Sequence, residues 1–241
     1  MFIIYFNKKL ILKLLFICIL FIKYKDKKEI KISIFLPIYN KEKYIYKCIT
    51  NLQNQTLKDI EIIAVNDNSS DNTLKILINL ANNDRRIKII NNVKNHGLLC
   101  SRAMGILNSS GRYLMNLDPD DELENNESLE YLYNQSIKSN VDIISFDIYN
   151  KKLRKNIKCN HKNKIIKQPF LFESIFFRNN LIRDLLVWNK FVKKEIFIKA
   201  YEDFKNEIYG AKWNYFEDNI WSILINKHAK SKICLNKLIY I

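Results

Sequence analysis

Glycine and proline are scarce in this chain of 241 residues, which contains four glycines and three prolines. No stretch rich in glycine, proline or serine divides the sequence, which excludes a flexible linker between two domains. Hydrophobic residues make up 48% of the chain, enough for one well-packed core. The sequence therefore predicts one compact domain with, at most, a small addition.

Glycine-rich phosphate loops are also missing. The sequence contains neither Gly-x-Gly-x-x-Gly nor Gly-Lys-Ser/Thr, which excludes the dinucleotide fingerprint and the P-loop. A phosphate group bound by this chain would therefore be held through a metal ion.

The five cysteines do not form a framework. They are odd in number, lie far apart and include no Cys-x-x-Cys pair (Cys18, Cys48, Cys100, Cys159 and Cys234). This spacing excludes a set of structural disulfides and a structural zinc site.

Positive charge is abundant, since the formal net charge is +15. Such a surface suits anionic partners, for example nucleotide phosphates or acidic lipid headgroups. Helix-turn-helix spacing, zinc-finger spacing and an aromatic-glycine RNA-binding signature are all missing. We therefore expect no nucleic-acid partner.

Residues 1–30 form an apolar and basic segment ahead of the regular pattern. Its uninterrupted apolar part, Leu14 to Ile22, is shorter than the about 20 residues that a spanning helix needs. Three interpretations remain open: a spanning signal-anchor, an interfacial helix with snorkelling lysines, and a cleaved signal peptide, although no small-x-small site follows. We predict membrane association. The lysines that follow favour a cytoplasmic position for the rest of the chain (Lys23, Lys25, Lys27 and Lys28).

Short apolar runs alternate with helix-type patterns from Ile30 onward. The runs are typical of buried strands (Ile32–Ile38, Ile60–Val65, Ile87–Ile90, Tyr113–Leu117 and Val141–Ile148). Apolar residues at three-and-four spacing between them predict helices. This alternation predicts an α/β fold of βαβ units, with a mostly parallel sheet between layers of helices.

Carboxylates follow the fourth strand run directly, at Asp118, Asp120 and Asp121. Pro119 gives no N–H to a ladder, so the strand should end here and leave the acids at its carboxyl edge. No Lys or Arg occurs from Tyr113 to Ile137, and carboxylates this close need a cation among them. Oxygen ligands suit Mg²⁺ or Mn²⁺ bound together with a phosphate. The alternative is an acidic cap, in which Asp121, Glu122 and Glu124 favour the dipole of the next helix.

The other strand runs also end in polar residues. Asn40 follows the first run, and Asp67 lies in the loop after the second. Ligands of such sheets bind outside the carboxyl ends of the strands. We therefore expect Asn40, Asp67 and the 118–121 acids to meet at one cleft.

Two further features occur in the second half. Val187 to Phe191 is predicted to open a helix, and its Trp188 is either a stacking platform for a base or sugar, or a core residue. Glu217 and Asp218 start another helix, where the plain interpretation is favourable pairing with the helix dipole.

These motifs together resemble the family-2 glycosyltransferases. The resemblance runs from about residue 31 to the end and includes the motifs in their expected order (Pro37-Ile-Tyr-Asn40, Val65-Asn-Asp-Asn-Ser-Ser-Asp71, Asn95-His-Gly97, Ser101-Arg102, Gly111-Arg-Tyr113, Leu117-Asp-Pro-Asp-Asp121, Trp188-Asn-Lys190, Glu217-Asp218 and Leu238-Ile-Tyr240). It implies a Rossmann-like, A-type glycosyltransferase fold for residues 31–241. Residues 31–122 would be the nucleotide-sugar-binding half and residues 123–241 the acceptor half.

The resemblance implies a role for each matching residue. Pro37, Tyr39 and Asn40 would hold the nucleotide, and Asp67 would bond the uracil-type base. Arg102 would meet base or phosphate, Asp118 the ribose, and Asp120 a Mn²⁺ or Mg²⁺ ion to which Asp118 also contributes. Asp218 would be the catalytic base, with Glu217 as the alternative.

The implied activity is inverting transfer of a sugar from a nucleotide-diphosphate sugar, UDP-linked, to a hydroxyl of a glycan, lipid or protein. The chain stops at Ile241, where relatives usually continue, so we expect an incomplete acceptor side. A catalytically degenerate binding protein of the same fold is the alternative. A sugar-1-phosphate nucleotidyltransferase is disfavoured, because Pro37-Ile-Tyr-Asn40 is not the glycine-rich loop which that chemistry needs.

Overall fold

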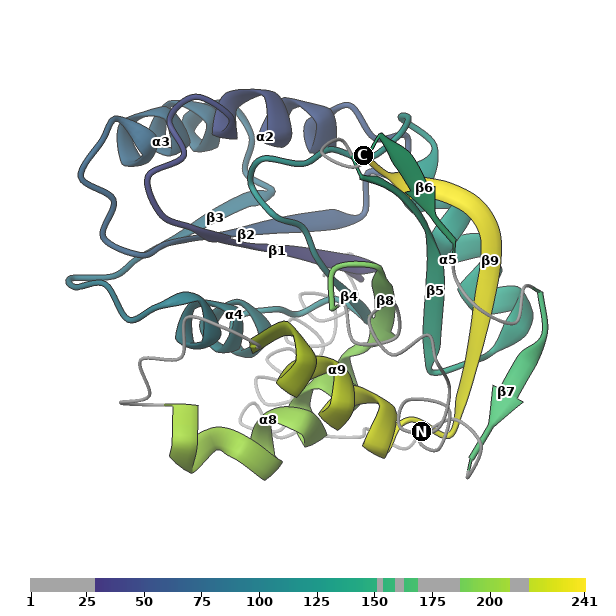
Figure 1. Ribbon diagram of the computed structural model, residues 1–241. Helices are drawn as coiled ribbons and strands as arrows, with labels where there is room; N and C mark the ends of the chain where they lie inside the picture. The colour runs from purple at the N-terminus through teal and green to yellow at the C-terminus, as the bar shows by residue number, and fades with distance from the viewer. Residues whose placement is uncertain (1–28, 151–153, 159–162, 169–186, 209–216) are drawn as a thin grey trace, which may run out of the picture.

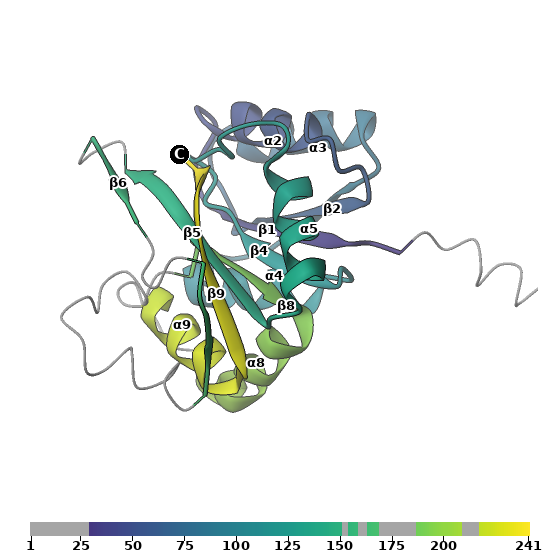
Figure 2. The ribbon, with the colours of Figure 1, turned by 90° about the vertical axis from the view of Figure 1, so that its right-hand side faces the viewer.

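The computed structural model describes residues 29–150, 154–158, 163–168, 187–208 and 217–241. Within these residues the chain forms one sheet of nine strands, with helices on both faces (Figures 1 and 2). The strands pair in the order β3-β2-β1-β4-β8-β5-β9-β7, and β6 pairs with β5.

One half of the sheet is wholly parallel. It contains the first four strands, β1 (Ile32–Ile38), β2 (Ile60–Asn66), β3 (Ile87–Asn91) and β4 (Tyr113–Asn116). Every residue of β1 and β2 is buried, which explains why their sequences are mostly apolar. The crossovers are helices α2 (Ile45–Gln53), α3 (Thr73–Asn83) and α4 (Leu98–Leu107). All four carboxyl ends therefore lie at the same edge.

The other half is mixed. Strand β8 (Lys190–Lys193) runs antiparallel to both β4 and β5 (Ile143–Asn150), and β9 (Ser231–Tyr240) runs parallel to β5. Short strands β6 (Lys155–Ile157) and β7 (Ile165–Lys167) complete it. Its helices are α5 (Ser128–Ser139), α8 (Lys194–Ile208) and α9 (Glu217–His228).

Two apolar cores sit on opposite faces of the sheet. One packs α2, α3 and α5 against β1 and β2, and the other packs α4, α8 and α9 against the reverse face. Figure 1 shows α2 and α3 above the parallel strands and α4, α8 and α9 below them. The α/β fold with a central, mostly parallel sheet between helices is confirmed.

The predicted helix start at Val187 to Phe191 is wrong. Residues 190–193 form β8, and α8 begins only at Lys194. A strand of four residues carries too little periodicity to be told from a first helical turn. Its extended conformation depends instead on ladders with β4 and β5, which are distant in sequence.

The acids of the 118–124 loop do not cap the next helix. Helix α5 begins at Ser128, and Glu130 is the acidic residue of its first turn. The loop instead pairs with the end of the chain. Glu122 and Ile241 exchange two backbone hydrogen bonds of 2.9 Å, and the Glu124 N–H donates to the Ile239 carbonyl at 2.8 Å.

The predicted membrane segment falls almost entirely outside the described residues, which start at residue 29. No helix in the described part of the chain is both long and apolar enough to span a bilayer.

Candidate active site

A cleft of about 650 Å³ opens at the carboxyl edge of the parallel strands. Five of the predicted site residues line it (Pro37, Tyr39, Asp67, Asp118 and Asp120). The other four, which lie elsewhere, are not among the described residues that line it (Asn40, Arg102, Glu217 and Asp218). The loops after β1, β2 and β4 therefore meet as the sequence predicted.

Hydrogen bonds join the loop after β1 to the loop after β2. Asn40 has a φ of 50°, a left-handed conformation that asparagine tolerates better than most residues. Its side-chain oxygen accepts hydrogen bonds from Ser70, and its N–H donates to Ser69 Oγ at 3.0 Å. The Lys41 N–H donates to Thr73 Oγ1 at 2.8 Å. Asn40 thus shapes the mouth of the cleft through the backbone of its neighbours.

Asp67 is buried at the base of the cleft and organises the segment before α4. Its Oδ1 accepts from Asn92 Nδ2 at 2.7 Å and from the His96 N–H at 2.9 Å. Its Oδ2 accepts from the Gly97 N–H at 2.8 Å. Gly97 has a φ of 86°, a conformation that favours glycine. A nucleotide base would meet a carboxylate whose orientation is already set by three protein donors.

Each of three acids after β4 has a cation from another element. Arg102 Nη2 lies 3.6 Å from Asp118 Oδ1, Lys41 Nζ 3.0 Å from Asp120 Oδ2, and Lys47 Nζ 2.7 Å from Glu122 Oε1. The sequence predicted a cation among these acids, and the fold supplies three: Arg102 from α4, Lys41 from the loop before α2, and Lys47 from α2. The fold thus places positive charge beside acids that have no Lys or Arg within the 113–137 stretch of the sequence.

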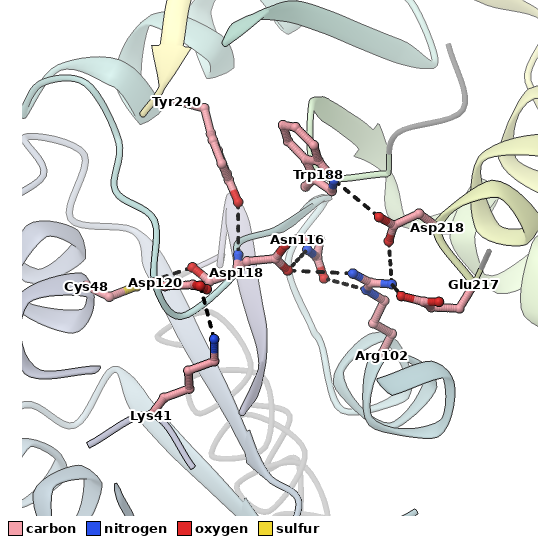
Figure 3. A network of polar contacts seen from close by, with 10 residues as sticks. All are labelled: Lys41, Cys48, Arg102, Asn116, Asp118, Asp120, Trp188, Glu217, Asp218 and Tyr240. Carbon is pink, nitrogen blue, oxygen red and sulfur yellow. Dashed lines mark hydrogen bonds and ion pairs between the residues drawn. The ribbon is translucent and has the colours of Figure 1, made fainter. Parts of the chain in front are cut away.

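Arg102 is the centre of a polar network below the cleft (Figure 3). It projects from α4 and is only 1% exposed. Its Nη1 lies 2.5 Å from Asp218 Oδ1 and 3.5 Å from Glu217 Oε1. Its Nε donates to Asn116 Oδ1 at 3.3 Å, and Asn116 Nδ2 donates to Asp118 Oδ1 at 3.1 Å. The network thus links the acids after β4 to the acids that begin α9.

The pKa values of Asp118 and Asp218 are both raised. Burial raises the pKa of Asp118, an effect that Arg102 opposes and Asp218 strengthens. Burial likewise raises the pKa of Asp218, and Arg102 opposes the rise while Glu217 adds to it. A carboxylate with a raised pKa accepts a proton more readily, which suits a general base.

Trp188 and Tyr240 contact the two aspartates at the ends of this network. The Trp188 Nε1–H donates to Asp218 Oδ2 at 3.2 Å, and its ring stacks on Tyr240 with centroids 5.5 Å apart. The Asp118 N–H donates to the Tyr240 hydroxyl at 3.1 Å. Burial, together with Asp118 and Asp121, raises the pKa of Tyr240 far above its ordinary value. Trp188 therefore orients Asp218, while Tyr240 fixes the start of the acidic loop.

The donor set around the acidic loop fits a hard divalent cation bound together with a ligand. Among the described residues, no three His, Cys, Asp or Glu side chains are arranged to hold a metal. Asp118 and Asp120, both lining the cleft, offer oxygen atoms only. Mg²⁺ and Mn²⁺ are commonly held by one or two carboxylates together with the phosphates of a substrate. The two aspartates are thus suited to an ion that a phosphate ligand helps to bind.

Sequence reasoning missed three contributors to the site. Lys41 follows Asn40 but matches no motif, so only the structure shows it beside Asp120. Tyr240 was recognised only as part of a terminal motif, and its contact with Asp118 joins residues that are 122 positions apart in the sequence. Lys190 is fully buried and lies near enough to Asp218 to lower its pKa. The Trp-Asn-Lys motif was the signal that could have indicated it.

Comparisons with known proteins identify the family of this chain. The sequence model of Glycosyl transferase family 2 matches residues 33–200. A cholesterol galactosyltransferase of Borreliella burgdorferi is 30% identical over 221 residues, which cover 87% of this chain and 59% of that protein. The chain spans between 32% and 62% of the length of the curated relatives that match most of it.

Two solved structures share the fold. TarS of S. aureus, residues 1–349, has a TM-score of 0.69 and 22% identity, over 87% of this chain and 59% of that one; it has also been solved with UDP-GlcNAc. The mannosyltransferase PcManGT of Pyrobaculum calidifontis, solved with GDP-Man and Mn²⁺, has a TM-score of 0.60 and 12% identity, over 88% of this chain and 57% of that one. With the family match covering more than half of its residues, the chain belongs to glycosyl transferase family 2.

Proposed function

We propose that this chain transfers a sugar from a nucleoside-diphosphate sugar, UDP-linked, to a hydroxyl group of an acceptor, with inversion at the anomeric carbon. The observation that carries the proposal is the Arg102 network, which joins Asp118 in the cleft to Asp218 at the start of α9. A donor site and a general base must lie close together for such a reaction, and this network brings candidates for both to one place. The UDP-GlcNAc complex of TarS supports the choice of donor class.

Asp218 is the proposed base. An acceptor hydroxyl must lose a proton as it attacks, and a positioned carboxylate contributes about 10²- to 10⁴-fold to such a step. The Trp188 indole and the Arg102 guanidinium hold the two oxygens of Asp218 in place. Attack from the face opposite the leaving diphosphate gives inversion in one step.

Asp118 and Asp120 are the proposed metal ligands. A Mn²⁺ or Mg²⁺ ion on the donor diphosphate would stabilise the charge of the leaving group as a Lewis acid. The Mn²⁺ complex of PcManGT supports use of a divalent ion within this fold. Pro37, Tyr39 and Asp67 would bind the nucleoside portion, since all three line the same cleft.

The test is calorimetric titration of the full chain with UDP, with and without Mn²⁺. We expect Mn²⁺ to tighten UDP binding at least about tenfold, which is about 1.4 kcal/mol. Asp120→Ala should abolish that gain. Absence of UDP and GDP binding under both conditions would contradict the proposal.

The alternative is a nucleotide-sugar binding protein that has lost catalysis. It would keep metal-assisted UDP binding but would be indifferent to Asp218→Ala in a donor-turnover assay. The Arg102–Asp218–Trp188 arrangement favours the enzyme, because a binding protein has no need to orient that carboxylate.

We also propose that residues 1–30 associate with a membrane, with the domain on the cytoplasmic side. A second hollow of about 790 Å³ borders Glu29 and Ile30, and most of its charged lining is basic (Arg112, Lys193, Lys194 and Lys199). Such a surface is suited to anionic headgroups. Flotation of the full chain with phosphatidylglycerol vesicles tests this, and a protein that stays unbound at low salt would contradict it.

A further inference from the structure

The cleft has more negative than positive charge before any donor binds. The described residues of its lining include three carboxylates, Asp67, Asp118 and Asp120, and a single cation, Lys41. A nucleoside diphosphate is itself anionic, so entry into this cleft requires positive charge close to the acids. The position and freedom of Lys41 therefore matter for donor binding.

The backbone of Lys41 is fixed by a hydrogen bond, whereas its tip makes an exposed ion pair and lies 5.8 Å from the centre of the Tyr44 ring. Its N–H donates to Thr73 Oγ1 at 2.8 Å, which fixes the start of the side chain. Its Nζ lies 3.0 Å from Asp120 Oδ2, and the two side chains are 29% and 45% exposed. Exposed ion pairs of this kind contribute little, and the lysine stem is flexible. The contact can therefore break at low cost without disturbing the loop.

The other two cations near the acids differ in this respect. Arg102 is buried and shared among several carboxylates, so it cannot leave them without exposing unpaired charge. Lys47 contacts Glu122, but neither residue is among the described residues that line the cleft. Lys41 alone among these three cations lines the cleft and contacts a predicted metal ligand.

We propose that Lys41 is an exchangeable counterion: it pairs with Asp120 in the free protein, yields Asp120 to a divalent cation when a donor binds, and then donates to the donor diphosphate. The inference rests on the proposed function and adds to it a residue that binds the diphosphate. It follows that Lys41 opposes binding of the metal alone and favours binding of metal and diphosphate together.

The experiment compares wild type with Lys41→Met, which keeps an unbranched stem of about the same length and removes the charged amino group. Binding of Mn²⁺ alone is followed by electron paramagnetic resonance, and binding of UDP with Mn²⁺ by calorimetry. We expect Lys41→Met to bind Mn²⁺ alone about threefold more tightly, because a competitor for Asp120 is gone. We expect it to bind UDP with Mn²⁺ about tenfold more weakly, because a charge-assisted hydrogen bond is lost.

Two control variants make the result specific. Lys47→Met removes a neighbouring cation that pairs with the same loop, and it should change neither measurement. Lys41→Arg keeps the charge and should keep most of the UDP affinity. Equal melting temperatures of the variants show that folding is unaffected.

Three outcomes would overturn the inference. If Lys41→Met equals wild type in both measurements, the ion pair is not used by the site. If it weakens both, Lys41 only supports the acidic loop. If the wild type binds neither UDP nor GDP, the proposed function is wrong and this inference with it, whereas a failure of the variant alone leaves the proposed function standing.

Discussion

Arg102 Nη1 lies 2.5 Å from Asp218 Oδ1, a contact between α4 and α9. Arg102 comes from α4, which starts at the loop that Asp67 organises, and Asp218 comes from the first turn of α9. The contact thus links α4, which follows the loop that Asp67 organises, to α9, which carries the candidate base. The Arg102 side chain is buried among carboxylates, and the base or phosphate contact that the resemblance implies for it stays a prediction.

Arg102→Met should destabilise the protein by about 3 kcal/mol at pH 7.5, since it leaves buried carboxylates without their cation. This deficit in the free energy of unfolding, relative to wild type, depends on pH. Burial already raises the pKa of Asp118 and Asp218, and loss of the opposing Arg102 charge raises both further. The folded variant then binds protons more tightly than the unfolded chain, so the deficit shrinks as the pH falls toward 4.

Urea unfolding at pH 7.5 and pH 4.5 measures this effect. Arg112→Met serves as the matched control, because Arg112 is exposed and lies over the Tyr113 ring rather than among acids. We expect the control to change stability by less than about 1 kcal/mol. A deficit of Arg102→Met that stays constant with pH would contradict the electrostatic explanation.

Asp218→Asn should lower donor turnover by about 10²- to 10⁴-fold while leaving UDP affinity within about twofold. The amide keeps the size of the carboxyl group and can still accept from Trp188, but its NH₂ group then faces the Arg102 guanidinium. Equal melting temperatures of the variant and wild type are therefore needed to show that the loss of turnover reflects lost basicity. Glu217→Gln tests the alternative base and should retain most of the activity. UDP release from UDP-GlcNAc is the measurement, and selective loss in Glu217→Gln would instead make Glu217 the base.

The pH profile of the wild type provides a second check on Asp218. Burial raises the pKa of this group above its ordinary value of 3.8. A base must be deprotonated to act. Turnover should therefore increase as the pH rises through this elevated pKa, and it should be low at pH values below it. The acidic limb should disappear in Asp218→Asn, whose residual activity should not follow that titration.

Asp67→Asn should weaken both the fold and UDP binding. An amide cannot accept with both of its terminal atoms, so at least one of the donors from Asn92, His96 or Gly97 loses its hydrogen bond to residue 67. The cost of such a buried unpaired group is about 1 to 3 kcal/mol. UDP affinity should fall as well, because Asn95 and Gly97 line the cleft.

Asp120→Asn is the comparison for this prediction. Asp120 is largely exposed and belongs to the same cleft, so its replacement should weaken metal-assisted UDP binding without lowering the urea midpoint. If Asp67→Asn behaves in the same way as Asp120→Asn, then Asp67 is only a ligand contact. The predicted structural role of its three hydrogen bonds would then be wrong.

Local sequence predicted the parallel half of the sheet because each of its strands is a mostly apolar run with a helical pattern further along the chain. The same local signal failed at β8, whose four residues become a strand only through pairing with β4 and β5. In the site too, local sequence predicts some features and misses others. Asp118 and Asp120 follow from the end of a strand, whereas the contacts of Arg102 with Asp218 and of Lys41 with Asp120 join distant parts of the chain.

Glu61→Gln should lower the free energy of unfolding by about 2 kcal/mol at pH 7, because Glu61 is a buried acid on β2 whose carboxylate accepts from Ser33, Lys88 and Ser110. Burial would raise the pKa of Glu61, but the hydrogen bonds from these three residues outweigh it and hold the pKa below the ordinary value of 4.5. A depressed pKa adds stability that is fully present above the unfolded-state value and is lost as the pH falls through the folded-state value. Wild type and Glu61→Gln should therefore differ in stability at pH 7 and converge near pH 3, which urea unfolding at both pH values can measure.

The control is Glu127→Gln. Glu127 lies at an exposed position, so this variant should match wild type at both pH values. An equal deficit of Glu61→Gln at both pH values would show that packing, rather than the charged hydrogen bonds, accounts for the effect.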